Sequence, residues 1–254
     1  MIDIHSHILW GMDDGPERLE DAVVMAKQAQ EQGIYAMIAT PHYKNGHYEN
    51  KKKEIKKAVE KFNHELRLQK LDVNIVPGQE VRLHRHLLDD YRKGDILTLN
   101  EGRYLLVECP SGRVPTYTNK ILYELQVAGI IPVLAHPERN QEFIEHPNKL
   151  FEVVNRGVLT QVTASSLTGR FGKKVKRFAE QLIENRLTHF IASDTHNIGS
   201  RPNELRLAFE TIANTFDQNT VYLLQENAES LIYGEEVYAD PPNQIKQKKF
   251  LGIF

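Results

Sequence analysis

The chain has 254 residues, of which 41% are hydrophobic and 26% are charged, proportions of a folded globular protein rather than a disordered or collagen-like one. Its 32 Lys and Arg nearly balance its 34 Asp and Glu, so it has no basic field to hold nucleic acid, and we expect no nucleic-acid partner. The one cysteine, Cys109, excludes both an intrachain disulfide and a thiolate metal cage.

No segment of the sequence predicts export or membrane insertion. The first residues, Met-Ile-Asp-Ile-His-Ser-His, lack a basic stretch followed by an apolar one, and no run of about 18 apolar residues occurs. Together with the single cysteine, this predicts a cytoplasmic protein.

Short apolar runs rich in Val, Ile, Leu and Ala alternate along the chain with segments of helical periodicity. In chain order, we predict a strand at 2–4, a helix with Leu19, Val23, Ala26 and Ala29 on its apolar face, a strand at 35–39, a helix with Ile55, Val59, Phe62 and Leu66 on its apolar face, strands at 73–76 and 104–107, a helix at 119–128, a strand at 132–135, a helix at 148–155, a strand at 159–162, a helix at 173–186, a strand at 189–192, and helices at 203–216 and 221–232. Gly129, Gly157 and Gly234 are predicted helix stops.

Seven apolar strands separated by helices predict a parallel sheet covered on both faces. The expected fold is therefore α/β: a distorted seven-stranded, TIM-like (β/α)7 barrel in a single domain, with a doubly wound open sheet as the alternative. No repeat or linker divides the chain before about residue 234. We expect a barrel domain over 1–234 and a C-terminal tail over 235–254, where two prolines precede a basic and apolar end.

Histidines and carboxylates follow nearly every predicted strand, and the carboxyl ends of parallel strands converge on one face. These residues are His5, His7, His42, Glu80, Glu108, His136, Asp194 and His196. A single histidine at a strand end is usually structural. Two histidines at i and i+2, as in His5 and His7, point to the same side of a strand and can reach one ion. The occurrence of a histidine or a carboxylate at six strand ends predicts a metal site.

The number of candidate ligands exceeds what one ion with open positions needs, so more than one ion is expected. A carboxylate such as Glu80 could bridge two ions, an arrangement used in phosphoryl hydrolysis. Imidazole and carboxylate ligands without sulfur suit Mn, Fe, Zn or Co. Arg139 and Arg201 closely follow two of the predicted ligand positions and predict a phosphate clamp, although each alone would be read as a surface arginine.

The sequence lacks the motif of cysteine-dependent tyrosine phosphatases, in which an arginine follows the cysteine after five intervening residues. Pro115 occupies that position relative to Cys109, and Arg113 has the wrong spacing. Cys109 is therefore expected to be a packing residue at a strand end.

Seven motifs of the chain resemble those of the polymerase and histidinol phosphatase (PHP) family, and within it the bacterial protein-tyrosine phosphatases of capsule and exopolysaccharide clusters, the CpsB/CapC/YwqE type. The motifs are Asp3-Ile4-His5-Ser6-His7, Asp13-Asp14-Gly15-Pro16, Thr40-Pro41-His42, Gly78-Gln79-Glu80, Glu108, His136-Pro137-Glu138-Arg139 and Ser193-Asp194-Thr195-His196. They cover residues 1 to about 234. The second and sixth are the motifs specific to the tyrosine phosphatase branch.

The resemblance implies three divalent metal ions per chain. One ion would bind His5, His7, Glu80 and Asp194, a second Glu80, Glu108 and His136, and a third Asp14, His42 and His196. The resemblance adds Asp14, a loop residue that the strand-end argument misses, and it places Arg139 and Arg201 on the substrate phosphate. Manganese is the expected metal, with Fe, Co, Zn or Mg as alternatives.

The activity implied by the resemblance is hydrolysis of phosphotyrosine by a metal-bound hydroxide. The implied substrate is an autophosphorylated bacterial tyrosine kinase with its membrane modulator, which would recruit the enzyme to the inner face of the membrane without insertion. The alternatives are a small-molecule phosphoesterase such as histidinol phosphatase, and a metal-stabilised kinase-docking module without catalysis. The C-terminal tail could support docking or self-association into a homo-oligomer.

Overall fold

The structure is a computed structural model that describes residues 1–246. Its strands are β1 (Ile2–Ser6), β2 (Ala36–Ala39), β3 (His42–Tyr43), β4 (Asn74–Pro77), β5 (Glu80–Arg82), β6 (Tyr104–Glu108), β7 (Ile131–Ala135), β8 (Leu159–Thr163) and β9 (Phe190–Ala192). Its helices are α1 (Leu19–Glu31), α2 (Lys52–Leu68), α3 (Leu87–Lys93), α4 (Thr118–Val127), α5 (Gln141–Glu145), α6 (Pro147–Val154), α7 (Ala164–Thr168), α8 (Lys173–Glu184), α9 (Leu205–Thr215) and α10 (Gln218–Tyr233), with short 3-10 helices η1 (Leu99–Glu101) and η2 (Pro137–Arg139).

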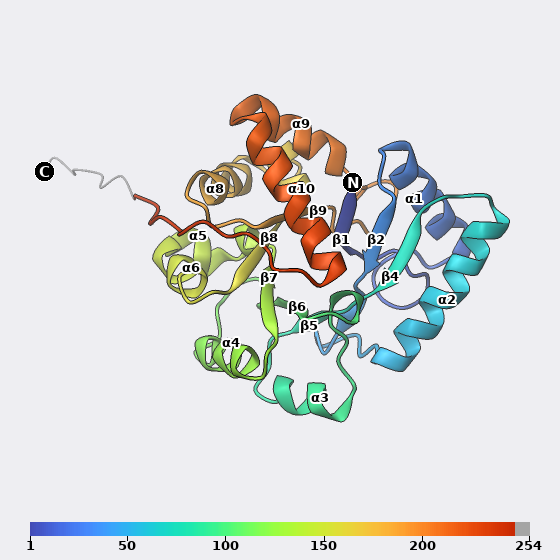
Figure 1. Ribbon diagram of the computed structural model, residues 1–254, viewed down its shortest axis with the longest axis horizontal. Coiled ribbons are helices and arrows are strands. Elements are labelled where there is room, and N and C mark those ends of the chain that lie inside the picture. Colours follow the sequence, from blue (N-terminus) through green and yellow to red (C-terminus); the bar gives the residue numbers. More distant parts are fainter. Residues whose placement is uncertain (247–254) are drawn as a thin grey trace, which may run out of the picture.

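The strands form two parallel sheets within a single α/β domain, with helices around them (Figure 1). One sheet has the order β1-β2-β4 and the other the order β3-β5-β6-β7-β8-β9. All seven predicted strands are present, and β3 and β5 are additional. Thr40 and Pro41 separate β3 from β2, and Gly78 and Gln79 separate β5 from β4. Proline cannot donate to a strand ladder, which accounts for the first break.

Both faces of the strands are buried, as the apolar runs predict. In β6, Leu105 and Val107 belong to the larger core cluster, which the surrounding helices complete, whereas Tyr104 and Leu106 belong to a smaller cluster. The smaller cluster gathers side chains from most of the other strands and from α10. Since polar residues on either face of such strands need partners, we expect the functional site near the strand ends.

The long helices match the sequence periodicity. The predicted face of α2 is buried, and α10 begins where the Asp217 side chain accepts a hydrogen bond from Thr220 N at 2.7 Å. α10 ends at Gly234, whose φ of +74° is a left-handed conformation that glycine adopts without strain. The short helices α3, α5 and α7 are not predicted, because five to seven residues are too few to establish a periodic pattern.

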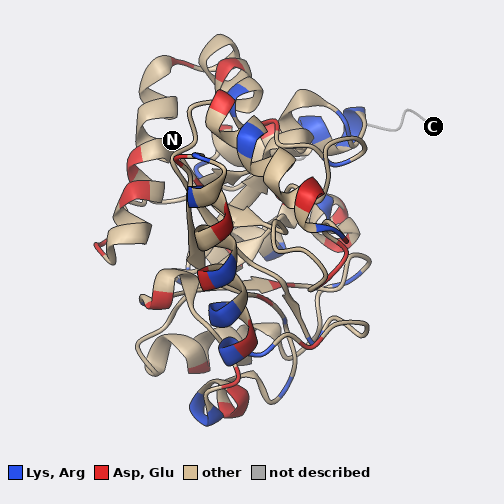
Figure 2. Ribbon diagram, turned by 90° about the vertical axis from the view of Figure 1, so that its right-hand side faces the viewer, with Lys and Arg blue, Asp and Glu red and all other residues tan. Residues whose placement is uncertain are grey.

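Residues 235–246 follow α10 without regular structure and contact the domain. Tyr104 Oη donates a hydrogen bond to Glu235 O at 2.5 Å and accepts one from Val237 N at 3.2 Å. The rest of the predicted tail, residues 247–254, lies outside the described residues. No helix in the described part of the chain is long and apolar enough to cross a membrane. Basic and acidic residues are interspersed on the face shown in Figure 2.

Candidate metal centre

The predicted ligands meet at the carboxyl ends of the strands. His5 lies in β1, Glu80 begins β5 and Glu108 ends β6. The other candidates are His7 just after β1, Asp14 in the following loop, His42 at the start of β3, His136 just after β7, and Asp194 and His196 just after β9. Three overlapping groups have ligand atoms within 4.8 Å of one another: His7, Asp14, His42 and His196; His5, His7 and Glu80; and His42, Glu80 and Glu108.

Glu80 is the centre of this arrangement. Its Oε2 lies 3.0 Å from His42 Nδ1, and its Oε1 lies 2.7 Å from His136 Nε2. The same Oε2 is 3.5 Å from His5 Nε2 and 3.3 Å from His7 Nε2. One buried carboxylate therefore faces four imidazoles, which is the geometry expected of a ligand shared between cations.

Asp194 joins the histidines of β1 to the two predicted arginines. Its Oδ1 is 3.4 Å from His5 Nε2 and 3.5 Å from His7 Nε2. Its Oδ2 is 2.8 Å from Arg139 Nη1 and 2.9 Å from Arg201 Nη2. One face of this carboxylate is thus directed at the ligand cluster, and the other fixes both guanidinium groups beside it.

The loop residue Asp14 completes the opposite side of the cluster. Its Oδ1 lies 3.4 Å from His42 Nε2 and 3.3 Å from His196 Nε2. The Asp14 side chain is 45% exposed, unlike the buried carboxylates of the strand ends. This side of the cluster is therefore open to solvent and to a substrate.

Three residues that sequence reasoning did not single out support the ligand candidates. Asp13 Oδ2 lies 2.6 Å from His7 Nδ1, and Gln161 Oε1 lies 2.8 Å from His5 Nδ1. Arg82 Nη2 pairs with Glu108 Oε1 at 3.1 Å. Such contacts fix the ring orientation of a metal-binding histidine. A glutamine in the middle of the predicted strand at 159–162 is the sequence signal that could have revealed Gln161.

Burial and neighbouring charges set the protonation of the cluster. Burial lowers the pKa of His136 to about 4, and the charge of Arg139 acts in the same direction. Burial also lowers the pKa of His196 to about 4. Burial opposes the charged form of His7 too, but the Asp13 carboxylate and the hydrogen-bonding carboxylate of Glu80 together outweigh it and raise that pKa to about 9. Burial and the charge of Glu80 raise the pKa of Glu108 to about 7.

The donor set fits divalent cations. Carboxylate oxygens lie 3.0 Å from His42 Nδ1 and 3.3 Å from His196 Nε2, yet neither nitrogen makes a hydrogen bond of acceptable geometry with a described residue. Glu108 Oε1 lies 3.1 Å from Arg82 Nη2 but likewise makes no hydrogen bond of acceptable geometry with a described residue. Buried polar atoms without a hydrogen bond are costly, and a bound cation would satisfy such atoms. Imidazole and carboxylate ligands without sulfur suit transition-metal ions.

Two candidate ligands have an unusual backbone. His136 has φ of +35° and Asp194 has φ of +51°, the left-handed region that residues other than glycine rarely adopt. Each immediately or closely follows the end of a strand, where the chain turns sharply. Such conformations concentrate at functional sites, where the surrounding structure holds the side chain in place.

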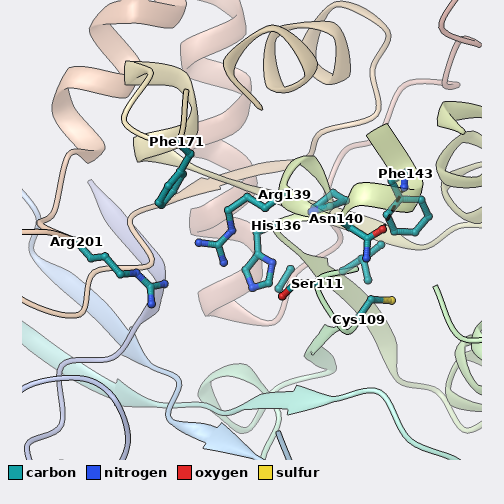
Figure 3. Close-up of a pocket in the computed structure, with 11 residues that line it drawn as sticks. Cys109, Ser111, His136, Arg139, Asn140, Phe143, Phe171 and Arg201 are labelled. Carbon is teal, nitrogen blue, oxygen red and sulfur yellow. Dashed lines mark hydrogen bonds between the residues drawn. The ribbon is translucent and has the colours of Figure 1, made fainter. Parts of the chain in front are cut away.

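A cavity of about 390 Å³ adjoins the cluster at His136. The guanidinium groups of Arg139 and Arg201 extend into it, and the Phe171 ring lies beside Arg139 (Figure 3). Cys109 contributes to the same cavity but is buried, and burial raises the pKa of its thiol to about 12. The thiol is therefore protonated at neutral pH and is not a nucleophile, in agreement with the sequence argument.

Comparison with known proteins identifies the family. The family model described as "Capsular polysaccharide synthesis, CpsB/CapC" matches residues 1–233. The tyrosine-protein phosphatase YwqE of Bacillus subtilis is 41% identical over the whole of both chains, and the putative tyrosine-protein phosphatase CapC of Staphylococcus aureus is 38% identical over the whole of both. The tyrosine-protein phosphatase CpsB of Streptococcus agalactiae is 32% identical over 91% of this chain and 98% of its own.

A solved structure agrees with these relatives. It is described as belonging to the crystal structures of YwqE from Bacillus subtilis and CpsB from Streptococcus pneumoniae, "unique metal-dependent tyrosine phosphatases". It superposes with a TM-score of 0.95 at 40% identity and covers 97% of this chain and 100% of its own. The chain described here therefore belongs to the CpsB/CapC family of capsular polysaccharide synthesis.

Proposed function

We propose that this protein is a metal-dependent phosphatase that hydrolyses phosphotyrosine in proteins. The observation that carries the proposal is Asp194, whose carboxylate joins the imidazoles of His5 and His7 to the guanidinium groups of Arg139 and Arg201. A cation site and an oxyanion site are thereby adjacent. The names of the relatives YwqE, CapC and CpsB supply the substrate class.

The proposed cofactor is three divalent ions, with manganese as the expected metal and Fe, Co, Zn or Mg as alternatives. The proposed ligands of the first ion are His5, His7, Glu80 and Asp194, those of the second Glu80, Glu108 and His136, and those of the third Asp14, His42 and His196. When bound, such ions stabilise developing negative charge and lower the pKa of water. The groups of neighbouring ligand atoms support the sharing of His5, His7 and Glu80 and of Asp14, His42 and His196. Asp194 is added by its distances to His5 and His7, and His136 by its 2.7 Å distance to Glu80, whereas His42 also lies beside Glu80 and Glu108.

The residues of the chain bind and orient the phosphate. Arg139 and Arg201 each present a planar guanidinium, which can form paired hydrogen bonds with phosphate oxygens and offset their charge in the transition state. Asp194 holds both groups at hydrogen-bond distance before a substrate arrives. The phenol of tyrosine has a pKa near 10. A phenolate therefore leaves with less help from a proton-donating acid than the alkoxide of serine would need.

The test uses one phosphotyrosine peptide, the same sequence with phosphoserine, and histidinol phosphate. We expect release of phosphate from the phosphotyrosine peptide, loss of that activity after chelation, and its recovery with Mn²⁺. His136→Ala should lower kcat/KM at least about 100-fold, whereas His64→Ala, which alters an exposed histidine of α2, should leave it unchanged. Preference for histidinol phosphate would support a small-molecule phosphoesterase, and hydrolysis that survives chelation and His136→Ala would refute the proposed site.

We further propose that the substrate is an autophosphorylated bacterial tyrosine kinase and that binding to it, with its membrane modulator, recruits a cytoplasmic enzyme to the inner membrane face. The capsule-synthesis family supports a partner in that process. Co-purification of the kinase with a His136→Ala variant, dependent on kinase phosphorylation, is the expected result. Equal capture of unphosphorylated kinase would instead favour a docking role.

We also infer that the two sheets act together as a distorted seven-stranded barrel over 1–234, followed by a tail over 235–254. The inference is supported by β3 and β5, which pair with each other as β2 pairs with β4. A parallel bridge between Ser6 and Thr195 links the chain after β9 to β1. The match of the family model to 1–233 supports the boundary. A chain ending at residue 234 should fold and retain activity, and failure to fold would move the boundary.

A further inference from the structure

The cavity beside His136 is lined by a half-buried aromatic side chain, Phe171, that the phosphate chemistry does not require. Phe171 lies in the loop between α7 and α8 and lines the cavity together with both arginines. Figure 3 shows its ring next to the Arg139 side chain, on the side away from the ring of His136. The ring therefore lines the same cavity as the two guanidinium groups proposed to bind the phosphate.

The loop that carries Phe171 is fixed at both ends. Gly169 and Gly172 have φ of +91° and +89°, so the chain reverses on either side of Arg170 and Phe171. Arg170 pairs with Glu204 through both Nε and Nη2. Ser165 Oγ and Thr168 Oγ1 donate to the other oxygen of Glu204 at 2.9 and 2.6 Å. The loop beside Phe171 is consequently anchored by a network outside the metal centre.

Phe171 is coupled to the phosphate clamp through Arg139. The guanidinium carbon of Arg139 lies 5.2 Å from the centroid of the Phe171 ring, a distance at which the ring face attracts a cation. On its other side Arg139 pairs with Asp194 at 2.8 Å. A phosphate bound at Arg139 would place the adjoining group of the substrate at the free part of the ring.

We propose that Phe171 forms a subsite for the aryl group of the substrate, so that the site selects aryl over alkyl phosphate monoesters. Aromatic rings pair favourably with centroids 4.5 to 7 Å apart. Because the Phe171 ring centroid is 5.2 Å from the Arg139 guanidinium carbon, we expect a phenyl ring joined directly to a phosphate at Arg139 to reach such a distance. An alkyl ester presents no ring there. The inference rests on the proposed phosphotyrosine hydrolysis and names the residue that would recognise the tyrosyl ring.

A purely structural role of Phe171 makes a different prediction. If the ring only packs against Arg139, its removal disturbs phosphate binding for every substrate alike. If it contacts the aryl group, its removal weakens aryl substrates selectively. The comparison of two substrate classes in one variant therefore separates the two roles.

The experiment compares Phe171→Ala, Phe171→Leu and Phe171→Trp with the wild-type holoenzyme, and Tyr123→Ala serves as a control at an exposed aromatic outside the site. The substrates are a phosphotyrosine peptide, phenyl phosphate and glycerol phosphate. We expect the Ala and Leu variants to lose about fivefold to tenfold in kcat/KM for both aryl substrates, mainly through KM, with less than twofold change for glycerol phosphate. Phe171→Trp should retain aryl turnover. Equal losses for aryl and alkyl substrates, or no loss, would overturn the proposal.

The affinity of the site for non-hydrolysable ligands tests the aryl subsite independently of catalytic activity. Phenylphosphonate and methylphosphonate are non-hydrolysable probes of the two classes, and their dissociation constants can be measured by calorimetry on the wild type and on Phe171→Ala. We expect the wild type to prefer phenylphosphonate by about fivefold or more and the variant to lose that preference. Absence of phosphotyrosine hydrolysis alongside this preference would reject the proposed function but retain the aryl subsite. Equal affinity of the wild type for both probes would reject the subsite.

Discussion

Removal of the Asp13 charge tests whether the first aspartate of the Asp13-Asp14 pair positions a metal ligand. Asp13 Oδ2 lies 2.6 Å from His7 Nδ1, and its side chain is 1% exposed. A buried hydrogen bond to a charged group contributes about 1.5 to 3 kcal/mol. At 1.4 kcal/mol per tenfold, this corresponds to about 10- to 100-fold in metal affinity, the range typical of groups that orient metal-binding histidines.

Two variants separate the effect of the Asp13 charge from that of the hydrogen bonds that its side chain accepts. Asp13→Asn keeps an oxygen that can accept from His7 Nδ1, so we expect a loss of about tenfold in metal affinity. Asp13→Ala also removes the acceptor of His42 N at 3.1 Å and of Gly15 N at 3.0 Å. For this variant we expect about 100-fold.

The assay is competition for Mn²⁺ with a chelator of known affinity, accompanied by the metal content of the purified protein and kcat/KM for a phosphotyrosine peptide. Asp89→Asn, which alters a carboxylate that is 56% exposed, is the matched control. Metal affinities of both Asp13 variants within twofold of wild type, with intact folding, would refute a positioning role for Asp13.

The other predictions concern the clamp, the thiol and pH. Arg139→Lys should lower kcat/KM for a phosphotyrosine peptide about 10- to 100-fold, because an ammonium lacks the planar fork that faces Asp194 and the phosphate; a wild-type rate would argue against a forked contact. Cys109→Ser should retain activity within about threefold, because burial raises the thiol pKa to about 12 and the thiol takes no part; loss of turnover with the metals still bound would contradict this. Burial lowers the pKa of His189 to about 4, and its Nδ1 accepts from Thr160 N at 3.0 Å, so it is neutral in the folded state. The unfolded chain, with a histidine pKa near 6.5, binds that proton first, so stability should fall as the pH drops from about 6.5 to 4, by about 3 kcal/mol in total. Denaturant titrations should show that the free energy of unfolding depends less on pH in His189→Asn than in the wild type. An unchanged dependence would exclude His189 as the source of the pH effect.

The sequence by itself determined the seven strand runs, the long helices and the positions of the ligand candidates. Those features depend on local periodicity, since an apolar run between helical segments has few alternatives other than a buried parallel strand. The convergence of His5, Glu80, His136 and Asp194 was also predictable, because the carboxyl ends of parallel strands share one edge. The family resemblance added Asp14, which belongs to a loop.

Only the tertiary structure decided which groups surround the ligands. Asp13, Gln161 and Arg82 contact His7, His5 and Glu108 through turns and strand neighbours whose register no local pattern specifies. The position of Phe171 likewise depends on the pairing of Arg170 with Glu204, 34 residues away along the chain. Such contacts are set by side-chain geometry between distant segments, and periodicity carries no information about them.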